Sequence, residues 1–365
     1  MTATARRHRK TSGWRIEKRL HVSNWDEALA LGAAIVAAIV VSSLLILVTG
    51  VSITDGLSAL VKGAVGSRHA AFETLVQATP LIFTGLAAAV AFRARIWNIG
   101  GEGQFFAGAM GTFWVANTFS GLPAVILLPA SLLGAMVAGA AWGSIAGYLK
   151  AKYATNEIIV TVMLNFVILL VLSYLLSEPW RAPDTFYYQT VHLPAAANLP
   201  RFITGSRLHW GFVLALVVAA LVYVILDKTS LGFEIRGLGI NRDAATFKGI
   251  NVARTTIIVM AISGAVAGLA GFSEVAGIHH RLQLDISAGY GFTGIIVALL
   301  GRLHPAGVVI AAIAFGALVN GSTNMQIATG IPAALVDVIQ GVTLVFVLIA
   351  AVAVRYKVRR VTHDG

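Results

Sequence analysis

The chain has 365 residues, of which 57% are hydrophobic and only 12% are charged, and its formal net charge is +11. A soluble domain carries about 25% charged residues, so this composition excludes an ordinary water-soluble protein. Because the chain has no cysteine, it has no disulfide, no thiolate nucleophile and no cysteine-ligated metal. Its nine histidines form no HExxH pair, so we expect no metal site. Basic cytoplasmic loops of a membrane protein explain the net charge better than a nucleic-acid partner does.

Apolar runs long enough to cross a bilayer recur along the chain. The first follows a basic segment, residues 1–27, and is too long for the apolar core of a signal peptide, so it is interpreted as an uncleaved span. The ten predicted spans are 28–49, 71–92, 103–119, 123–149, 157–177, 209–226, 255–276, 287–300, 305–320 and 333–354. The predicted fold is an all-α polytopic membrane protein, with residues 28–354 as one transmembrane domain and 355–365 as a basic cytoplasmic tail.

The basic residues predict the orientation of these spans. With a cytoplasmic N-terminus, 21 of the 27 Lys and Arg residues fall on the cytoplasmic side and six on the other. Cytoplasmic loops are enriched in Lys and Arg, so both termini are expected in the cytoplasm. Residues 178–208 then form an outer segment, and 227–254 form the only sizeable internal cytoplasmic loop.

The third and eighth predicted spans are interrupted by glycines. They open with residues 98–104 (NIGGEGQ) and residues 287–292 (SAGYGF). Spans two to five can be laid over spans seven to ten in reversed orientation, which predicts two inverted-repeat halves with the interruptions at matching places. Such segments indicate a substrate pathway, although ordinary helix packing explains the glycines equally well.

A few polar side chains fall at membrane depth, where burial is costly. Glu102 either caps the N-terminus of its own helix, which we favour, or contacts the transported solute. Glu157, Thr161 and Asn165 recur every four residues and so share one helix face. Asn165 needs a partner, either on a neighbouring helix or in a water-filled pore.

Four stretches are similar to the signatures of a known family. They are residues 98–104 (NIGGEGQ, against NIGxEGQ), 156–165 (NEIIVTVMLN, against EVIxTxMLN), 239–250 (GINRDAATFKGI, against GxNxxAAxxxGI) and 289–305 (GYGFTGIIVALLGRLHP, against GYGFxGIxVALLGxxxP). In order and spacing they resemble the branched-chain amino acid, ribose and nucleoside permease family of ABC importers. The second and fourth resemble its nucleoside or basic-membrane-lipoprotein-linked branch. Gly101 and Gly237 depart from the usual residues and add backbone freedom.

The resemblance implies a type II ABC importer subunit in the bacterial inner membrane. The implied partners are an ABC ATPase, a periplasmic or lipid-anchored substrate-binding protein and a second related permease, as a heterodimer or a homodimer. The chain contains no GxxxxGK[ST] motif, so it is expected to be no enzyme, with ATP and Mg on the partner ATPase. The resemblance also implies that residues 241–250 form a coupling helix, which sits in a cleft of the ATPase. The predicted ATPase-coupling residues are Arg236, Asn241, Arg242, Ala244, Ala245 and Lys248.

The predicted function is the translocation pathway for nucleosides, which need apolar or aromatic walls and neutral hydrogen-bonding groups. The candidate pathway residues are Glu102, Gln104, Phe105, Thr161, Asn165, Tyr290 and Phe292. A simple-sugar permease of the ribose type is the main alternative. An ion-coupled carrier would use acidic groups inside spans, for which Glu102 and Asp337 are the candidates. No convergent set of acid, base and nucleophile suggests a membrane enzyme.

Overall fold

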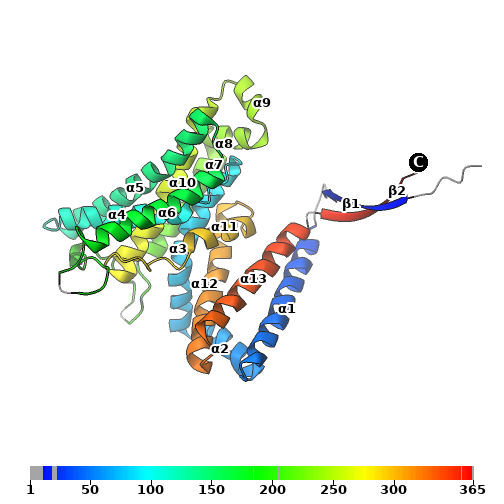
Figure 1. Ribbon diagram of the computed structural model, residues 1–365, viewed down its shortest axis with the longest axis horizontal. Helices are drawn as coiled ribbons and strands as arrows, with labels where there is room; N and C mark the ends of the chain where they lie inside the picture. Colours follow the sequence, from blue (N-terminus) through cyan, green and yellow to red (C-terminus); the bar gives the residue numbers. More distant parts are fainter. Residues whose placement is uncertain (1–10, 19–22, 184, 204, 355, 364–365) are drawn as a thin grey trace, which may run out of the picture. The chain divides into compact units, whose positions relative to one another are not determined.

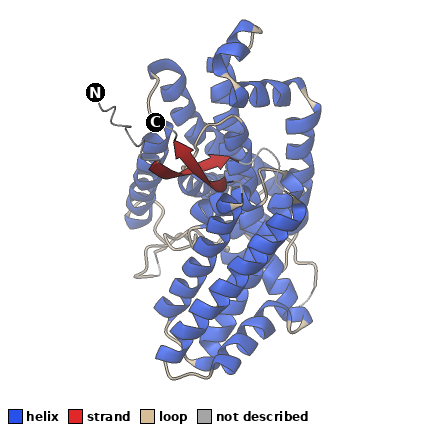
Figure 2. Cartoon of the chain, turned by 90° about the vertical axis from the view of Figure 1, so that its right-hand side faces the viewer, coloured by secondary structure: helices blue, strands red, loops and turns tan. Residues whose placement is uncertain are grey.

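The computed structural model describes residues 11–18, 23–183, 185–203, 205–354 and 356–363 of the chain. It divides into two compact units, one made of Met1–Leu57 with Thr329–Gly365 and the other of Ser58–Ala328. Helices form most of both units (Figure 1, Figure 2). The coarse prediction of a helical, polytopic membrane protein is therefore confirmed.

The smaller unit contains α1 (Asn24–Val48) and α13 (Ala333–Ala353), which pack against each other. Strands β1 (Thr11–Lys18) and β2 (Tyr356–His363) pair in antiparallel fashion, with Thr11 opposite His363. The sequence predicts only helices, so this two-stranded ribbon is a departure from the all-α prediction. It joins the two ends of the chain, and such a long-range pairing leaves no local signal in the sequence.

The larger unit holds most of the helices. The division between the two units falls within α2 (Ile53–Val65), between Leu57 and Ser58. The further elements of the larger unit are α3 (Arg68–Arg93), α4 (Gly101–Thr118), α5 (Ala124–Tyr153), α6 (Glu157–Ser177), η1 (Ala195–Ala197), α7 (Gly211–Lys228), α8 (Ser230–Ile240), α9 (Arg242–Phe247), α10 (Val252–Glu274), the π-helix η2 (Val275–His279), α11 (Tyr290–Leu300) and α12 (Pro305–Thr329). Side-chain caps explain several starts: Ser67 Oγ accepts from the Ala70 N–H, and Asn251 Oδ1 accepts from the Arg254 N–H.

Each of the ten predicted spans falls on a helix, but the helices differ in length. In the described part of the chain, seven helices are long and apolar enough to cross a membrane: α3, α5, α6, α7, α10 (with η2), α12 and α13. The apolar parts of α1 and α11, Gly32–Val48 and Tyr290–Leu300, are shorter. The number of crossings therefore stays a prediction.

The buried centre of the larger unit is made of α3, α4 and α10, and α5 packs against α4 and α10. α5 and α10 pack so closely that a Cβ atom on Gly264 would overlap with the carbonyl oxygen of Gly139. A Cβ atom on Gly268 would likewise overlap with the Ala135 carbonyl oxygen in α5, and one on Gly271 with the Phe105 carbonyl oxygen in α4. The glycines of α10 therefore allow close packing of the helix backbones.

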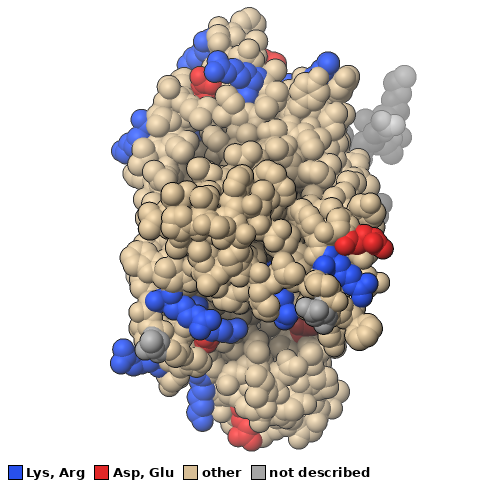
Figure 3. Space-filling model, turned by 90° about the vertical axis from the view of Figure 1, so that its left-hand side faces the viewer, with Lys and Arg blue, Asp and Glu red and all other residues tan. Residues whose placement is uncertain are grey.

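The larger unit has two ends that carry different elements. α8 and α9 form one, which we call the α9 end, and residues 178–183, 185–203 and 205–210 lie at the other, which we call the loop end (Figure 1). α3 connects the two, since Glu73 near its start pairs with Arg207 and Arg93 at its end pairs with Asp227. On the face shown in Figure 3, a broad band without charged side chains separates two groups of Lys and Arg residues. Such a band is expected of a surface that contacts lipid.

Candidate functional site

Two helices begin inside the larger unit, and their first turns touch. α4 starts at Gly101 and α11 at Tyr290. A Cβ atom on Gly291 would collide with the backbone of Glu102, and one on Gly101 would lie 3.3 Å from the Gly291 carbonyl oxygen. Glycine is required at such a close approach of two backbones. We call this meeting point the half-helix junction.

From the half-helix junction, α4 and α11 run toward opposite ends of the larger unit. The Phe113 ring of α4 lies 5.0 Å from the Trp180 ring at the loop end. Just beyond α11, the Leu303 carbonyl accepts a hydrogen bond from Arg93 Nε at 3.1 Å, toward the α9 end. This is the arrangement expected when matching elements of two inverted halves are interrupted.

Glu102 connects the two half-helices. Its side chain is buried, and its Oε2 accepts a hydrogen bond from the Gly291 N–H at 2.8 Å. The sequence favours a cap for its own helix, whereas the carboxylate caps the first turn of α11. One negative charge thus lies beside the positive ends of two helix dipoles, which stabilises their meeting.

The stripe on α6 holds the segment that precedes α4. Glu157 Oε1 accepts from the Trp97 N–H at 3.4 Å, Thr161 Oγ1 from the Ile99 N–H at 3.3 Å, and Asn165 Oδ1 from the Gly103 N–H at 2.8 Å. Asn165 Nδ2 also donates to the Ile99 carbonyl at 3.0 Å. The predicted common face is confirmed, and the partner of Asn165 is a neighbouring backbone segment.

Gln104 belongs to a second buried network. Its Oε1 accepts from Asn98 Nδ2 at 3.0 Å, and the same nitrogen donates to Ser263 Oγ at 2.8 Å. Ser263 Oγ donates in turn to the Ala87 carbonyl at 2.7 Å. Thr161, Asn165 and Gln104, proposed for the pathway from sequence, therefore act as a scaffold for residues 94–104 in this conformation.

The aromatic candidates divide into buried and accessible side chains. Phe105 is fully buried, with its ring 5.3 Å from Phe106 and 6.2 Å from Tyr290. Tyr290 is partly accessible, and its Oη donates to Gln77 Oε1 at 3.1 Å. Phe292 is exposed. Of the predicted aromatic residues, Tyr290 is the one with a polar contact beside the half-helix junction.

Two acidic residues that the sequence reasoning missed lie between the half-helix junction and the loop end. Glu73 and Glu274 are 6% and 4% exposed, and they lie on α3 and α10. Arg207 Nε donates to Glu73 Oε2 at 2.9 Å, and His279 Nε2 lies 3.5 Å from Glu274 Oε2. The sequence does indicate them, because both acidic residues lie inside predicted spans, 71–92 and 255–276, where a charged group is costly. Asp337, the other acidic candidate, is exposed on α13.

The segment predicted to dock an ATPase forms α8 and α9. Three of its candidate residues stabilise the segment itself. Asn241 Oδ1 caps α9 by accepting from the Asp243 and Ala244 N–H groups at 2.9 and 3.0 Å. Arg236 donates to the Leu226 carbonyl, and Ala245 is buried. Arg242, Ala244 and Lys248 are exposed and remain available to a partner.

Exposed apolar residues on the same segment were missed. Phe247 is 93% exposed and Ile240 is 76% exposed. A shallow cavity of about 260 Å³ lies between α8 and α9 and includes Phe233 and Lys248. Large apolar side chains presented by a polar loop mark an interaction surface. In the sequence, the apolar residues of segment 239–250 (GINRDAATFKGI) indicate this surface.

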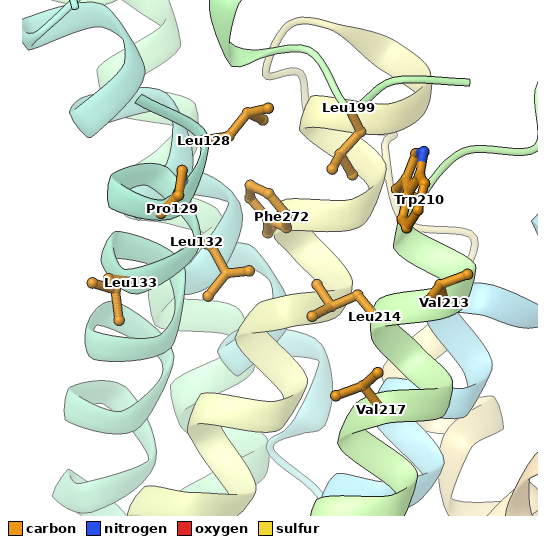
Figure 4. A pocket seen from close by; sticks show the side chains of 10 residues that line it. All are labelled: Leu128, Pro129, Leu132, Leu133, Leu199, Trp210, Val213, Leu214, Val217 and Phe272. Carbon is orange, nitrogen blue, oxygen red and sulfur yellow. The ribbon is translucent and has the colours of Figure 1, made fainter. Parts of the chain in front are cut away.

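A lateral groove between α5 and α7 is a different kind of site. Its volume is about 510 Å³, and its floor is Phe272 of α10 (Figure 4). Figure 4 shows Leu128, Leu132, Leu214 and their neighbours lining it, with Trp210 at one edge. No convergent polar groups face the groove, so it does not provide the hydrogen bonds that a polar solute needs. Within the described residues, no group of His, Asp or Glu is placed to hold a metal ion.

Membrane-spanning helices around two half-helices that meet in the interior define a polytopic membrane transport protein. The family described as "Branched-chain amino acid transport system / permease component" matches residues 70–348. The chain therefore belongs to this permease family.

Relatives extend the similarity over nearly the whole chain. The guanosine ABC transporter permease protein NupP of Bacillus subtilis is 38% identical, over 91% of this chain and 96% of its own length. The glucose ABC transporter permease protein TsgB13 of Haloferax volcanii is 35% identical, over 94% and 93%. The guanosine ABC transporter permease protein NupQ of Bacillus subtilis is 31% identical, over 67% and 78%.

Proposed function

We propose that this chain is the transmembrane permease subunit of an ATP-driven importer for nucleosides in a bacterial cytoplasmic membrane. The observation that carries the proposal is its 38% identity with a guanosine permease over 91% of the chain. The half-helix junction supports it, because its one carboxylate, Glu102, is occupied by the N-terminus of α11. A neutral solute needs no charged clamp at such a junction.

Import of a simple sugar is the second candidate function, favoured by the similarity to a glucose permease. The two functions differ in what a strain lacking this gene fails to take up. We expect loss of labelled guanosine or adenosine uptake, with ribose and branched-chain amino acid uptake unchanged. Guanosine uptake at the wild-type rate, together with loss of sugar uptake, would assign the protein to the second candidate.

The proposed orientation places the α9 end in the cytoplasm and the loop end outside, with ten membrane-crossing segments. The excess of Lys and Arg on the predicted cytoplasmic side supports it. α4 and α11 then cross as half-helices that meet near the middle of the membrane. The α9 end would face an ATPase, and the loop end would face a substrate-binding protein.

In this proposal, α8 and α9 dock in the ATPase, which holds ATP and Mg and does the hydrolysis. The exposed Phe247 and Ile240 would enter a cleft of the partner, with Arg242 and Lys248 at the rim. Ala244 is small and exposed beside them, as close docking requires.

Substitution of exposed residues on α9 tests the docking role. Ala244→Arg and Phe247→Ser are expected to leave the protein in the membrane and to abolish substrate-stimulated ATP hydrolysis by the assembled importer. Tyr153→Ser, at another exposed aromatic residue of the α9 end, is the matched control. If both α9 variants keep normal stimulation, the segment is only a connector.

A second, related permease is the proposed partner within the membrane. Two relatives from one organism, NupP and NupQ, carry the same guanosine permease description, which supports a heterodimer. Co-purification of the tagged chain with a second permease of the same strain tests this pairing, and recovery of self-pairs alone would favour the homodimer.

A further inference from the structure

A charged and polar cluster lies on the loop-end side of the half-helix junction, and Tyr290 is its one member among the candidate pathway residues. We call it the loop-end cluster; it consists of Glu73, Gln77, Arg207, Glu274, His279 and Tyr290. Its members come from α3, the loop segment, the end of α10 with η2, and the start of α11. Four parts of the chain that are distant in sequence therefore contribute to one polar site.

Arg207 connects the members of this cluster. It donates through Nε and Nη2 to Glu73 Oε2, and that hydrogen bond raises the pKa of the guanidinium above its ordinary value. The Glu274 carboxylate acts in the same direction, so it lies within electrostatic range of Arg207. Tyr290 Oη donates to Gln77 Oε1, one helical turn from Glu73 on α3.

The Glu73 carboxylate has unused capacity to accept hydrogen bonds, and Glu274 has a long contact with its partner. Glu73 Oε1 is buried and receives no hydrogen bond. The contact of Glu274 within the described residues is His279 Nε2 at 3.5 Å, beyond the length of a strong hydrogen bond. A buried acceptor without a donor is costly, and acidic residues inside a membrane protein mark functional sites.

The backbone beside Glu274 also departs from regular helix. α10 ends in the π-helix η2, and His280 after it adopts φ 53°. π-helical turns occur frequently at functional sites, where they re-aim neighbouring side chains.

We propose that the loop-end cluster is the subsite that takes the ribose of the nucleoside, with Glu73 and Glu274 accepting hydrogen bonds from its 2′- and 3′-hydroxyls. This rests on the proposed function. Carboxylates bind ribose hydroxyls in this way in dinucleotide sites, because two vicinal hydroxyls present paired donors. Arg207 donates to the hydroxyl oxygens and balances one of the two negative charges.

The subsite lies along the pathway between the loop end and the half-helix junction. Tyr290 belongs both to the loop-end cluster and to the first turn of α11 at the half-helix junction. A solute moving from the loop end would therefore meet the carboxylates before it reaches the junction. The half-exposed Arg207 side chain covers this approach.

The test compares uptake of guanosine with that of 2′,3′-dideoxyguanosine by the complete importer, in cells lacking other nucleoside uptake. The variants are Glu274→Gln and Glu73→Gln, and the matched control is Glu178→Gln, an exposed glutamate at the loop end. The same binding protein delivers both compounds, so a change in their ratio between variants reports on the permease.

We expect Glu274→Gln and Glu73→Gln to lower guanosine uptake about tenfold, through the loss of a charge-assisted hydrogen bond, and to change dideoxyguanosine uptake less than about twofold. A guanosine-to-dideoxyguanosine ratio that stays at the wild-type value would overturn the proposal, whether both rates fall or neither does. Either variant decides the question if the other does not accumulate in the membrane. If the wild-type importer takes up neither compound, the proposed function itself fails.

Discussion

At the scale of single residues, amide and hydroxyl side chains inside the bundle mostly satisfy backbone groups. Asn165 uses both ends of its amide, on the Gly103 N–H and the Ile99 carbonyl. The four-residue spacing of the α6 stripe predicts its common face, but spacing alone does not show whether a face meets a pore or a chain segment. Only the path of residues 94–104, which re-enter the bundle and form the first turn of α4, decides between them.

Replacing Asn165 with Leu is expected to destabilise the protein by about 2–3 kcal/mol, because a buried N–H and a buried carbonyl lose their partners. The midpoint of thermal unfolding of the detergent-purified protein measures this. Met163→Leu, an exposed position on the same helix, is the control. Equal midpoints for Asn165→Leu and the wild type would contradict the scaffold role.

His209 makes a pH-dependent contribution to stability. Burial lowers its pKa to about 4, and His280 and Arg201 act in the same direction. The unfolded chain takes up this proton near pH 6.5, before the folded one does, so the free energy of unfolding falls as the pH drops from about 6.5 to 4, by up to ~3 kcal/mol. As the pH drops between these values, the thermal unfolding midpoint of His209→Gln should fall less steeply than that of the wild type. Parallel curves for the two proteins would exclude the assignment.

At the scale of elements, the apolar runs predict where helices lie but not what their ends do. The glycines of residues 98–104 and 287–292 mark the two half-helices, yet the contact between Gly101 and Gly291 depends on packing 190 residues apart in sequence. α8 was expected only as part of a loop, whereas the family resemblance implies a coupling helix around residues 241–250, where α9 lies. The pairing of β1 with β2 is likewise invisible to local patterns, because it requires both chain ends to meet.

The contact between α5 and α10 can be tested at Gly264. Gly264→Val places a side chain against the Gly139 carbonyl and is expected to destabilise the protein by about 3 kcal/mol, or to prevent its accumulation in the membrane. Gly32→Val on α1, where no atom lies within 4 Å of the added Cβ, is the control. Normal thermal stability of Gly264→Val would show that the two helices pack less closely than described.

At the scale of the whole molecule, the distribution of Lys and Arg predicts orientation, and the chain has no cysteine to interfere with labelling. Tyr187→Cys and Ile240→Cys introduce single thiols at positions that are 77% and 76% exposed. In intact cells, an impermeant maleimide is expected to label position 187, and position 240 only after lysis. Labelling of position 240 in intact cells would show that the orientation is the reverse of the proposed one.

The central claim is ATP-driven import of a nucleoside through this chain. Its most direct test is uptake of labelled guanosine by liposomes that contain the assembled permeases and ATPase, with ATP and Mg inside and the binding protein outside. We predict accumulation of guanosine above its external concentration, and none with a non-hydrolysable ATP analogue or with glucose as solute. Accumulation that needs no ATP, or accumulation of glucose without guanosine, would contradict the account.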